Sequence, residues 1–355
     1  MTHLSNCLLT FFTRYIKILL YFYRKQGENV IKKLHFYISN DFDPYANLAR
    51  EKYLFDEVDG ETFILYLWQN QNTVVIGKNQ NALAECRTEL LESEGGHLAR
   101  RLSGGGAVFH DLGNLNFTFL CATENFDVDK QLSVIQRACA LAGIATERSG
   151  RNDVLADGRK FSGNAFYHSK GHSYHHGTLM IAADTEKMTR YLTPPKAKLE
   201  AKGVKSVRSR VVNLTELAPT LTCARMKEHL LTAFREVYGL PHEPLDEIKD
   251  ENIAEFTALF GSRAYLYGSP LPFNVSCSGR LSFGSVELQM QVTGGVIADL
   301  KLYTDALDTT LPDRVAHALI SRPVDLAAMR DALQKALPES EALDLVSLLS
   351  DQIFS

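Results

Sequence analysis

The chain has 355 residues, of which 45% are hydrophobic and 23% are charged, and its net charge is −4. This composition is typical of a globular protein, and the mildly negative charge excludes a global basic field for nucleic acid. The length exceeds what one compact core usually holds, so we expect two domains.

The cysteines are few and irregularly spaced. No pair has CxxC spacing, which argues against a zinc site or a redox pair. A long chain with scattered cysteines is typical of the cytoplasm, where thiols stay reduced. The six cysteines are Cys7, Cys86, Cys121, Cys139, Cys223 and Cys277.

The N-terminal residues form an unusual extension. Its segment Leu8–Tyr23 is rich in aromatic and aliphatic residues, but Arg14 and Lys17 interrupt it. The segment is too short and too charged for a membrane-spanning helix, and it lacks the cleavage pattern of a signal peptide. An amphipathic helix on a membrane surface is one interpretation. We favour a dispensable extension over residues 1–32, with the globular pattern beginning at Lys33.

From Lys33 onward the pattern alternates between strands and helices. Asp43 followed by Pro44 predicts an N-cap and the first position of a helix that runs through Val58. The predicted strand Leu34–Ser39 precedes this helix. After the helix, the predicted elements in chain order are the strands Thr62–Trp68 and Thr73–Ile76, a helix over Ala82–Ser93, the strands Ala107–His110 and Leu115–Cys121, and a helix over Lys130–Gly143.

The second half of the chain begins with a predicted hairpin. Asp157-Gly158 is a strong hairpin signal between the apolar runs of Asn152–Ala165. A strand over Gly177–Ala182, a helix over Thr185–Leu192 that stops at Pro194, and a helix over Cys223–Tyr238 follow. The prolines near Pro241 and the charged run Asp246–Glu251 predict a linker. Beyond it, the strands Arg280–Gln291 and Val296–Tyr303 and three helical segments over Pro312–Phe354 predict a small α+β domain.

Three consecutive glycines mark the segment Arg100–Asn116, which reads RRLSGGGAVFHDLGNLN. Glycines between apolar strands do not stabilise the strands, but they let the backbone approach a ligand closely. Freed N–H groups form an anion-binding concavity, and Arg101 and Ser103 add donors beside it. The loop is neither a P-loop nor a dinucleotide fingerprint. We interpret it as a nucleotide or acyl-phosphate site, with a flexible hairpin turn as the alternative.

A lysine follows the predicted turn in GRNDVLADGRKFSGNA, which spans Gly150–Ala165. Lys160 is followed by small residues that leave open space. Its ammonium suits a carboxylate and an α-phosphate on which negative charge builds. Asp153 is a candidate ligand for Mg²⁺ against phosphate oxygens. A solvated surface lysine and a turn carboxylate are the alternatives.

Two histidines and a basic segment complete the candidate site. His175 and His176 open the run HHGTLM and, by strand alternation, point to opposite faces, so one can line a pocket while the other does not. Their spacing matches no known metal motif, and a structural role is the alternative. The segment Lys196–Arg210 is either a solvated basic face or a loop that closes over a triphosphate.

Together these segments resemble the lipoate–protein ligase A family. RRLSGGGAVFHDLGN is similar to the glycine-loop signature of that family, GRND with GRKFSGNA to its lysine motif, and HHGTL to its next landmark. LEAKGVKSVRSRVVNL, over Leu199–Leu214, resembles its adenylate-binding loop. The resemblance runs from about Lys33 to the C-terminus. Tyr167 stands where some members carry a basic residue, a difference that bears on substrate details.

The resemblance implies an α+β fold with three parts. These are a large mixed-sheet catalytic domain at residues 33–245, related to biotin protein ligases and class II aminoacyl-tRNA synthetases, a linker region at 246–273, and a small C-terminal accessory domain at 274–355. It implies that lipoate and ATP give lipoyl-adenylate and pyrophosphate, with Mg²⁺ as cofactor. A lysine of an acceptor then takes the lipoyl group.

The resemblance also implies the acceptors and the site. The acceptors are lipoyl domains of 2-oxoacid dehydrogenase E2 subunits or the glycine-cleavage H protein, and we expect a cytoplasmic monomer without nucleic acid. Lys160 would touch the lipoyl carboxylate and the α-phosphate, and Asp153 would lie by Mg²⁺. The implied lipoate site adds Ser103, Gly105 and His176. The implied nucleotide site has Arg101, Gly106, Ala107, Val108, Phe109 and His110, and the adenylate loop has Lys202, Arg208 and Arg210.

A cysteine-dependent octanoyl- or lipoyltransferase on the same fold, which needs no ATP, is the nearest competing function. Cys121 follows the glycine loop and Cys139 lies in a predicted helix, and neither has a recognisable activating setting. Two further candidate functions are a biotin ligase and a non-catalytic regulator that binds lipoate or a nucleotide.

Overall fold

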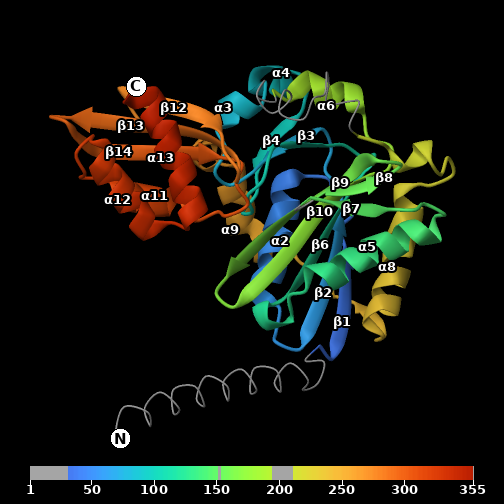
Figure 1. Cartoon of the computed structure of the whole chain (residues 1–355). Helices are drawn as coiled ribbons and strands as arrows, with labels where there is room; N and C mark the ends of the chain where they lie inside the picture. The colour runs from blue at the N-terminus through green and yellow to red at the C-terminus, as the bar shows by residue number, and fades with distance from the viewer. Residues whose placement is uncertain (1–30, 151–152, 194–210, 355) are drawn as a thin grey trace, which may run out of the picture.

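The computed structural model describes residues 31–150, 153–193 and 211–354. Most of the predicted N-terminal extension and the basic segment Lys196–Arg210 lie outside these residues. The largest element is an eight-stranded mixed sheet (Figure 1). In spatial order its strands are β11 (His242–Pro244), β1 (Lys33–Ile38), β2 (Thr62–Trp68), β6 (Asn114–Ala122), β10 (His172–Met180), β9 (Arg159–Ser169), β8 (Asp153–Ala156) and β7 (Glu147–Ser149).

Two smaller sheets accompany the large one. One has the order β4 (His97–Arg100), β3 (Thr73–Ile76), β5 (Val108–His110), and the other the order β12 (Val275–Arg280), β13 (Ser285–Thr293), β14 (Val296–Thr304). The α-helices of the described ranges are α2 (Pro44–Glu57), α3 (Ala82–Glu85), α4 (Thr88–Ser93), α5 (Val128–Leu141), α6 (Thr185–Tyr191), α8 (Cys223–Tyr238), α9 (Asp250–Gly261), α10 (Arg263–Tyr267), α11 (Leu311–Leu319), α12 (Leu326–Ala336) and α13 (Glu339–Ile353). Within those ranges no helix is both long and apolar enough to cross a membrane.

Helices cover both faces of the large sheet. Every residue of β2 is buried. Because successive strand residues point to opposite faces, Leu65 packs in a cluster with α5 and α8, whereas Tyr66 packs in another with α2 and α9. A strand buried on both faces reads as a continuous apolar run, which is how TFILYLW appears in the sequence.

The C-terminal residues have their own hydrophobic core. Side chains of β12, β13 and β14 pack with those of α11, α12 and α13 in one cluster, which draws all its members from residues 275–353. Figure 1 shows this unit, coloured orange to red, beside the large sheet. The mixed α+β architecture and the small α+β unit predicted from the sequence are confirmed.

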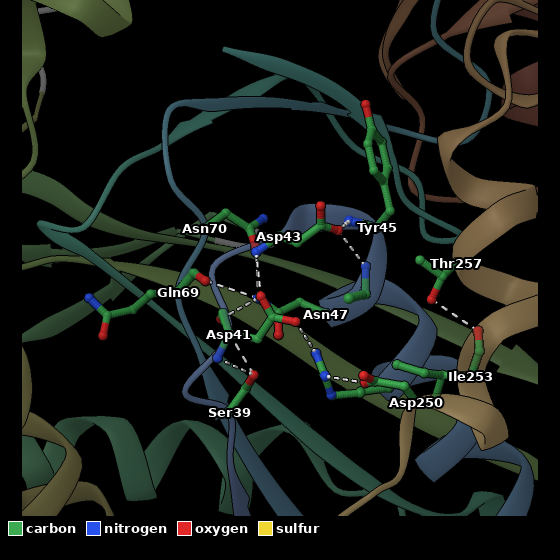
Figure 2. A network of polar contacts seen from close by, with 12 residues as sticks. Ser39, Asp41, Asp43, Tyr45, Asn47, Gln69, Asn70, Asp250, Ile253 and Thr257 are labelled. Atoms are coloured by element: carbon green, nitrogen blue, oxygen red, sulfur yellow. Dashed lines mark hydrogen bonds and ion pairs between the residues drawn. The ribbon is translucent and has the colours of Figure 1, made fainter. Parts of the chain in front are cut away.

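Helix α2 begins as predicted, with Pro44 at its first position and Asp43 as N-cap (Figure 2). The Asp43 carboxylate accepts from the backbone N–H groups of Tyr45 and Ala46, both at 2.8 Å. One turn later, Asn47 Nδ2 donates to the Gln69 carbonyl at 2.9 Å and to Asn70 Oδ1 at 3.1 Å. The helix start therefore fixes the turn between β2 and β3.

The single helix predicted over Ala82–Ser93 is wrong. The chain forms the short helices α3 and α4, and Cys86 between them is extended. Cys86 makes a β-bridge with Leu192, and the Arg87 N–H donates to the Tyr191 carbonyl at 2.9 Å. Pairing with a distant segment interrupts a pattern whose local spacing is helical.

The strand predicted from Gly177 begins earlier, because β10 starts at His172. Ser173, His175 and His176 of this strand are buried and have polar partners inside the protein, for example Ser173 Oγ 2.7 Å from His168 Nδ1. Such a strand lacks the apolar signal on which its start would be recognised.

The region predicted as a linker is not an extended connection. Strand β11 adds to the edge of the large sheet, and α9 packs against α2. Ile253 and Phe260 of α9 are buried in the cluster shared with α2. Arg50 of α2 is paired with Asp41 at 2.9 Å and with Asp250 at 3.4 Å. The charged run marks the start of this helix, where acidic residues are favourable.

Candidate active site

The glycine loop joins β4 to β5 and is built around a buried cation. The Arg101 guanidinium donates to the carbonyls of Val75 (3.1 Å), Gly104 (2.7 Å) and Gly106 (2.8 Å), and to Ser103 Oγ (3.1 Å). Burial lowers the pKa of Arg101 to about 10, so it remains a cation near neutral pH.

Glycine is required at the centre of this loop. Gly105 has φ +89°, and a Cβ there would lie 3.0 Å from Arg101 Nη2. The Gly105 N–H donates to the Ala306 carbonyl of the small domain at 3.3 Å. The loop is therefore a contact between the two parts of the chain as well as a wall of the site.

A buried polar chain runs behind the loop. Ser103 Oγ lies 2.7 Å from His176 Nε2, and His176 Nδ1 lies 2.9 Å from Glu51 Oε1. Glu51 also accepts from Thr118 Oγ1 at 2.7 Å, which in turn accepts from Trp68 Nε1 at 3.1 Å. These groups come from α2, β2, β6, β10 and the loop. Their mutual hydrogen bonds fix the orientation of these five side chains.

His110 is held as a neutral donor. Its Nδ1 lies 3.3 Å from Asn70 Nδ2, so Nδ1 accepts and Nε2 carries the proton. Burial lowers the pKa of His110 to about 3, and Arg101 and His176 act in the same direction. Nε2 is buried and has no hydrogen-bond partner in the described part of the chain. Asn70 is itself held by Asn47, as Figure 2 shows.

His175 and His176 point to opposite faces of β10, as predicted. His175 lies on the α5 face, with Nδ1 3.0 Å from Gln131 Oε1 and Nε2 2.8 Å from Asn164 Oδ1. Burial, followed by His176, lowers the pKa of His175 to about 3. His175 thus has a structural position, and Asn164 connects it to the site.

Acidification is expected to destabilise the fold because His110 and His175 are kept neutral. The unfolded chain protonates them near pH 6.5. Between about pH 3 and about pH 6.5 the unfolded state binds more protons, so stability falls as pH drops through that window. Denaturant unfolding at about pH 7.5 and about pH 5.5 measures the slope, at most about 1.4 kcal/mol per unit for each histidine. His175→Gln should flatten the slope, and His97→Gln, at an exposed position, should not. Equal slopes in all three proteins would contradict this.

The β8–β9 hairpin presents Lys160. Asp157 and Gly158 at its turn have positive φ, which allows the tight turn predicted from the sequence. Lys160 Nζ lies 2.6 Å from Asp153 Oδ1, and both side chains are partly exposed. A Cβ at Gly163 would lie 2.9 Å from Lys160 Nζ, so this glycine leaves the room that the lysine occupies.

Residues 199–210 of the predicted adenylate loop, with Lys202, Arg208 and Arg210, lie outside the described residues. The chain returns at Val211, which forms a parallel bridge with Lys160. The Val212 N–H donates to the Lys160 carbonyl at 2.9 Å. The residues that follow the basic segment are therefore paired directly with the strand that carries the lysine.

A cavity of about 450 Å³ brings these segments together. Ser103 and Phe109 are absent from its lining. Ser103 contacts His176, which lines the cavity, and Phe109 packs against Tyr191 on the other side of the strand. The predicted residues that line the cavity are Arg101, Gly105, Gly106, Ala107, Val108, His110, Asp153, Lys160 and His176.

Several residues of this site were not predicted. Glu51 and Thr118 are ordinary polar residues in a helix and a strand, and only the three-dimensional pairing reveals them. Other unpredicted residues line the cavity: Trp68, Asn116, Asn164 and Thr178 from the large sheet, and Arg280, Ser282, Phe283, Asp305 and Leu307 from the small domain. Thr178 lies in the HHGTL motif, which could have indicated it as a site residue. No motif in the sequence points to the small-domain residues.

No cysteine in the described ranges lines the cavity. Burial raises the pKa of the Cys121 and Cys139 thiols to about 12, so both are protonated thiols near neutral pH. A nucleophilic cysteine needs the opposite environment. Nor do the described residues contain a group of three or more potential metal ligands.

Two parts of the chain match known families. Residues 43–235 match the family described as "Lipoyl protein ligase A/B catalytic domain", and residues 271–349 match "Bacterial lipoate protein ligase C-terminus". A lipoate-protein ligase A of Bdellovibrio bacteriovorus is 38% identical over 326 residues, which cover 89% of this chain and 96% of the relative. The lipoate-protein ligase A of Psychrobacter cryohalolentis is 37% identical over 313 residues, 84% of this chain and 92% of the relative.

Solved structures agree in fold. The crystal structure of P. falciparum LipL1 in complex with lipoate superposes with a TM-score of 0.77 at 27% identity, covering 90% of this chain and 99% of that one. A crystal structure of lipoate-protein ligase A bound with ATP gives a TM-score of 0.58 at 21% identity, covering 67% of this chain and 99% of that one. The second likeness supports the fold alone.

Proposed function

The chain belongs to the lipoate–protein ligase A family, and from that premise we propose how its cavity carries out the reaction of an ATP-dependent lipoate–protein ligase. The enzyme joins lipoate to a lysine of a lipoyl-domain protein in two half-reactions. A carboxylate oxygen of lipoate attacks the α-phosphorus of ATP, and pyrophosphate leaves. The amine of the acceptor lysine then attacks the acyl carbon, and AMP leaves.

Lys160 bears the charge of the first step. The carboxylate and the α-phosphate are both anions, and their approach needs a cation between them. Lys160 lines the cavity on the β8–β9 hairpin, where its ammonium is paired with Asp153. The single observation that carries the proposal is this lysine facing the glycine loop across one cavity.

The glycine loop binds the nucleotide side of the adenylate. Gly105, Gly106, Ala107 and Val108 line the cavity with backbone, and His110 offers its Nε2 proton. Arg101 is a positioning residue as well as a wall of the site, because its guanidinium donors contact loop carbonyls. The lipoyl side lies toward His176, whose ring is fixed by Ser103 and Glu51.

The site fits Mg²⁺ if phosphate oxygens of ATP supply part of its coordination. The metal is usually held by one or two carboxylates together with substrate phosphates, and Asp153 lines the cavity with a partly exposed carboxylate. When bound, the metal would neutralise phosphate charge. Asp153 is the residue proposed to hold it, and Lys160 keeps that carboxylate oriented.

A ligase accounts for this site better than a cysteine-dependent transferase. The transferase chemistry requires a thiolate next to the acyl group, whereas Cys121 and Cys139 are buried thiols that do not line the cavity. A regulator without activity would not need a lysine and a carboxylate paired at the cavity wall.

The wider proposals follow from the family. The acceptors are lipoyl domains of 2-oxoacid dehydrogenase E2 subunits or the glycine-cleavage H protein, and the enzyme acts as a cytoplasmic monomer. Residues 33–245 form the catalytic part, α9 and α10 extend its core, and residues 274–355 complete the site from the accessory domain.

Mass spectrometry of a lipoyl domain tests the function. We expect a lipoyl adduct only when enzyme, lipoate and ATP are all present, and we expect Cys121→Ser to give the same yield. An adduct formed without ATP from an acylated carrier protein, and lost in Cys121→Ser, would establish the transferase in its place.

A further inference from the structure

The small domain supplies one wall of the cavity. Arg280 and Ser282 end β12 and begin its turn, Phe283 follows, and Asp305 and Leu307 lie just after β14. Among the described lining residues, three are lysines or arginines: Arg101, Lys160 and Arg280. The first two have the roles derived above, and Arg280 has none.

Arg280 is held in place by its own domain. Its Nη1 lies 3.1 and 3.2 Å from the two carboxylate oxygens of Asp305 and donates to Ser285 Oγ at 2.9 Å. Asp305 is fixed in turn, since its Oδ1 accepts from the Ser285 N–H at 2.7 Å and its side chain is 8% exposed. The described residues engage only one nitrogen of the Arg280 guanidinium, and the side chain is 34% exposed.

The same segment is attached to the glycine loop. Ala306, the residue after Asp305, accepts from the Gly105 N–H at 3.3 Å. A Cβ at Gly104 would lie 2.3 Å from the Ala306 carbonyl oxygen, so the two backbones are in direct contact. Thr304 donates its N–H to the Asn79 carbonyl at 2.9 Å, which adds a second connection. Arg280 is therefore placed against the glycine loop through Asp305.

The chemistry of the site calls for a further cation. Arg101 is committed to protein carbonyls, and Lys160, which is paired with Asp153, is the cation proposed above for the carboxylate and the α-phosphate. The β- and γ-phosphates carry the remaining charge of ATP and gain more as the bond between the α-phosphorus and its bridging oxygen breaks. The electron pair of that bond stays on the departing pyrophosphate. A planar guanidinium with donors to spare binds phosphate oxygens in a bidentate manner, and the β- and γ-phosphates offer more such oxygens than the single carboxylate of lipoate does.

We propose that Arg280 is a catalytic residue of the adenylation step, which binds the β- and γ-phosphates of ATP and stabilises the pyrophosphate that leaves. Asp305 is its positioning residue. The inference rests on the proposed function, because it assigns a partner to the leaving group of that reaction. Arg280 would act in the first half-reaction only, because the second half-reaction contains no pyrophosphate.

Kinetics of the full-length protein test the assignment. In lipoate-dependent exchange of pyrophosphate into ATP, Arg280→Ala should lower kcat/KM for ATP by about 10- to 100-fold. The KM for lipoate should stay within about two-fold, and the inhibition constant for pyrophosphate should rise. Arg280→Lys should recover part of the loss, because it keeps the charge without the fork. Transfer from chemically prepared lipoyl-adenylate to a lipoyl domain should proceed at the wild-type rate.

Arg314→Ala is the matched control. Arg314 lies in α11 of the same domain, is paired with Asp308 and is exposed to 32%, but it does not line the cavity. This replacement should leave kcat/KM for ATP unchanged.

If wild-type protein shows no exchange, the proposed function fails. If wild-type exchange is normal and Arg280→Ala matches it, or if Arg280→Ala slows transfer from lipoyl-adenylate equally, the assignment of Arg280 is overturned. Should Arg280→Ala fail to fold, the ATP kinetics of Arg280→Lys decide, and wild-type values there would also overturn it.

Discussion

Replacing Lys160 by alanine is expected to lower kcat for lipoylation by about 10²- to 10³-fold or more, with the fold intact. The ammonium is the cation that the proposed mechanism places between two anions, and water in the vacated space is a poor substitute for an oriented charge. The Lys160–Asp153 pair is partly exposed, so its loss should cost less than about 1 kcal/mol of stability. Steady-state lipoylation and thermal unfolding measure the two effects separately.

Lys187→Ala provides the control for this variant. Lys187 is an exposed lysine of α6 that does not line the cavity, and its loss should change neither rate nor stability. If Lys160→Ala kept the wild-type rate, the role assigned to this lysine would be wrong, whatever the family.

Replacing Arg101 by alanine is expected to remove activity through the loop instead of through a lost substrate contact. The change leaves the carbonyls of Val75, Gly104 and Gly106 without their common donor. The contacts to Val75 and Gly104 are buried, and each unsatisfied buried acceptor costs about 1–3 kcal/mol, so we expect at least about 2 kcal/mol of destabilisation. Arg101→Lys should be intermediate, because one ammonium cannot reach all these acceptors. Denaturant unfolding together with the ligation rate measures the change.

The control for Arg101 is a surface arginine. Arg137→Ala removes an exposed pair with Glu236, and exposed pairs contribute at most about 1 kcal/mol. An Arg101→Ala protein of wild-type stability that had lost only ATP affinity would contradict the positioning role and favour a direct contact with the nucleotide.

The sequence predicts the parts of the site whose chemistry is local. Glycines beside Arg101, a lysine after Asp157-Gly158, and a pair of histidines in one strand are short patterns with a physical meaning, and the structure brings them to one cavity. The opposite directions of His175 and His176 also follow from strand geometry alone.

The rest depends on which strands become neighbours. Glu51 meets His176 across 125 positions of sequence, and Trp68 meets Thr118 across 50. Phe109 was assigned to the nucleotide, yet alternation along β5 turns its side chain toward Tyr191. Arg280 becomes part of the site only because Ala306 contacts the glycine loop. Such pairings are set by packing, for which a single sequence carries no local signal.

The segment predicted as a linker contains the helix α9, which the sequence did not reveal for a related reason. A charged run near prolines resembles an exposed connection, but Asp250 and Glu251 form the first turn of α9. The apolar residues that follow, such as Ile253 and Phe260, then reach the core shared with α2. The charged residues of this segment lie on the exposed face of α9, and those apolar residues form the buried face that the composition did not indicate.

Exchange of labelled pyrophosphate into ATP tests the central claim most directly, because it reports formation of an acyl-adenylate without any acceptor. We expect the wild-type protein to catalyse exchange that requires lipoate, and Lys160→Ala to lose it. Absence of lipoate-dependent exchange in a folded wild-type protein, with octanoyl transfer from a carrier protein in the absence of ATP, would contradict the proposed function.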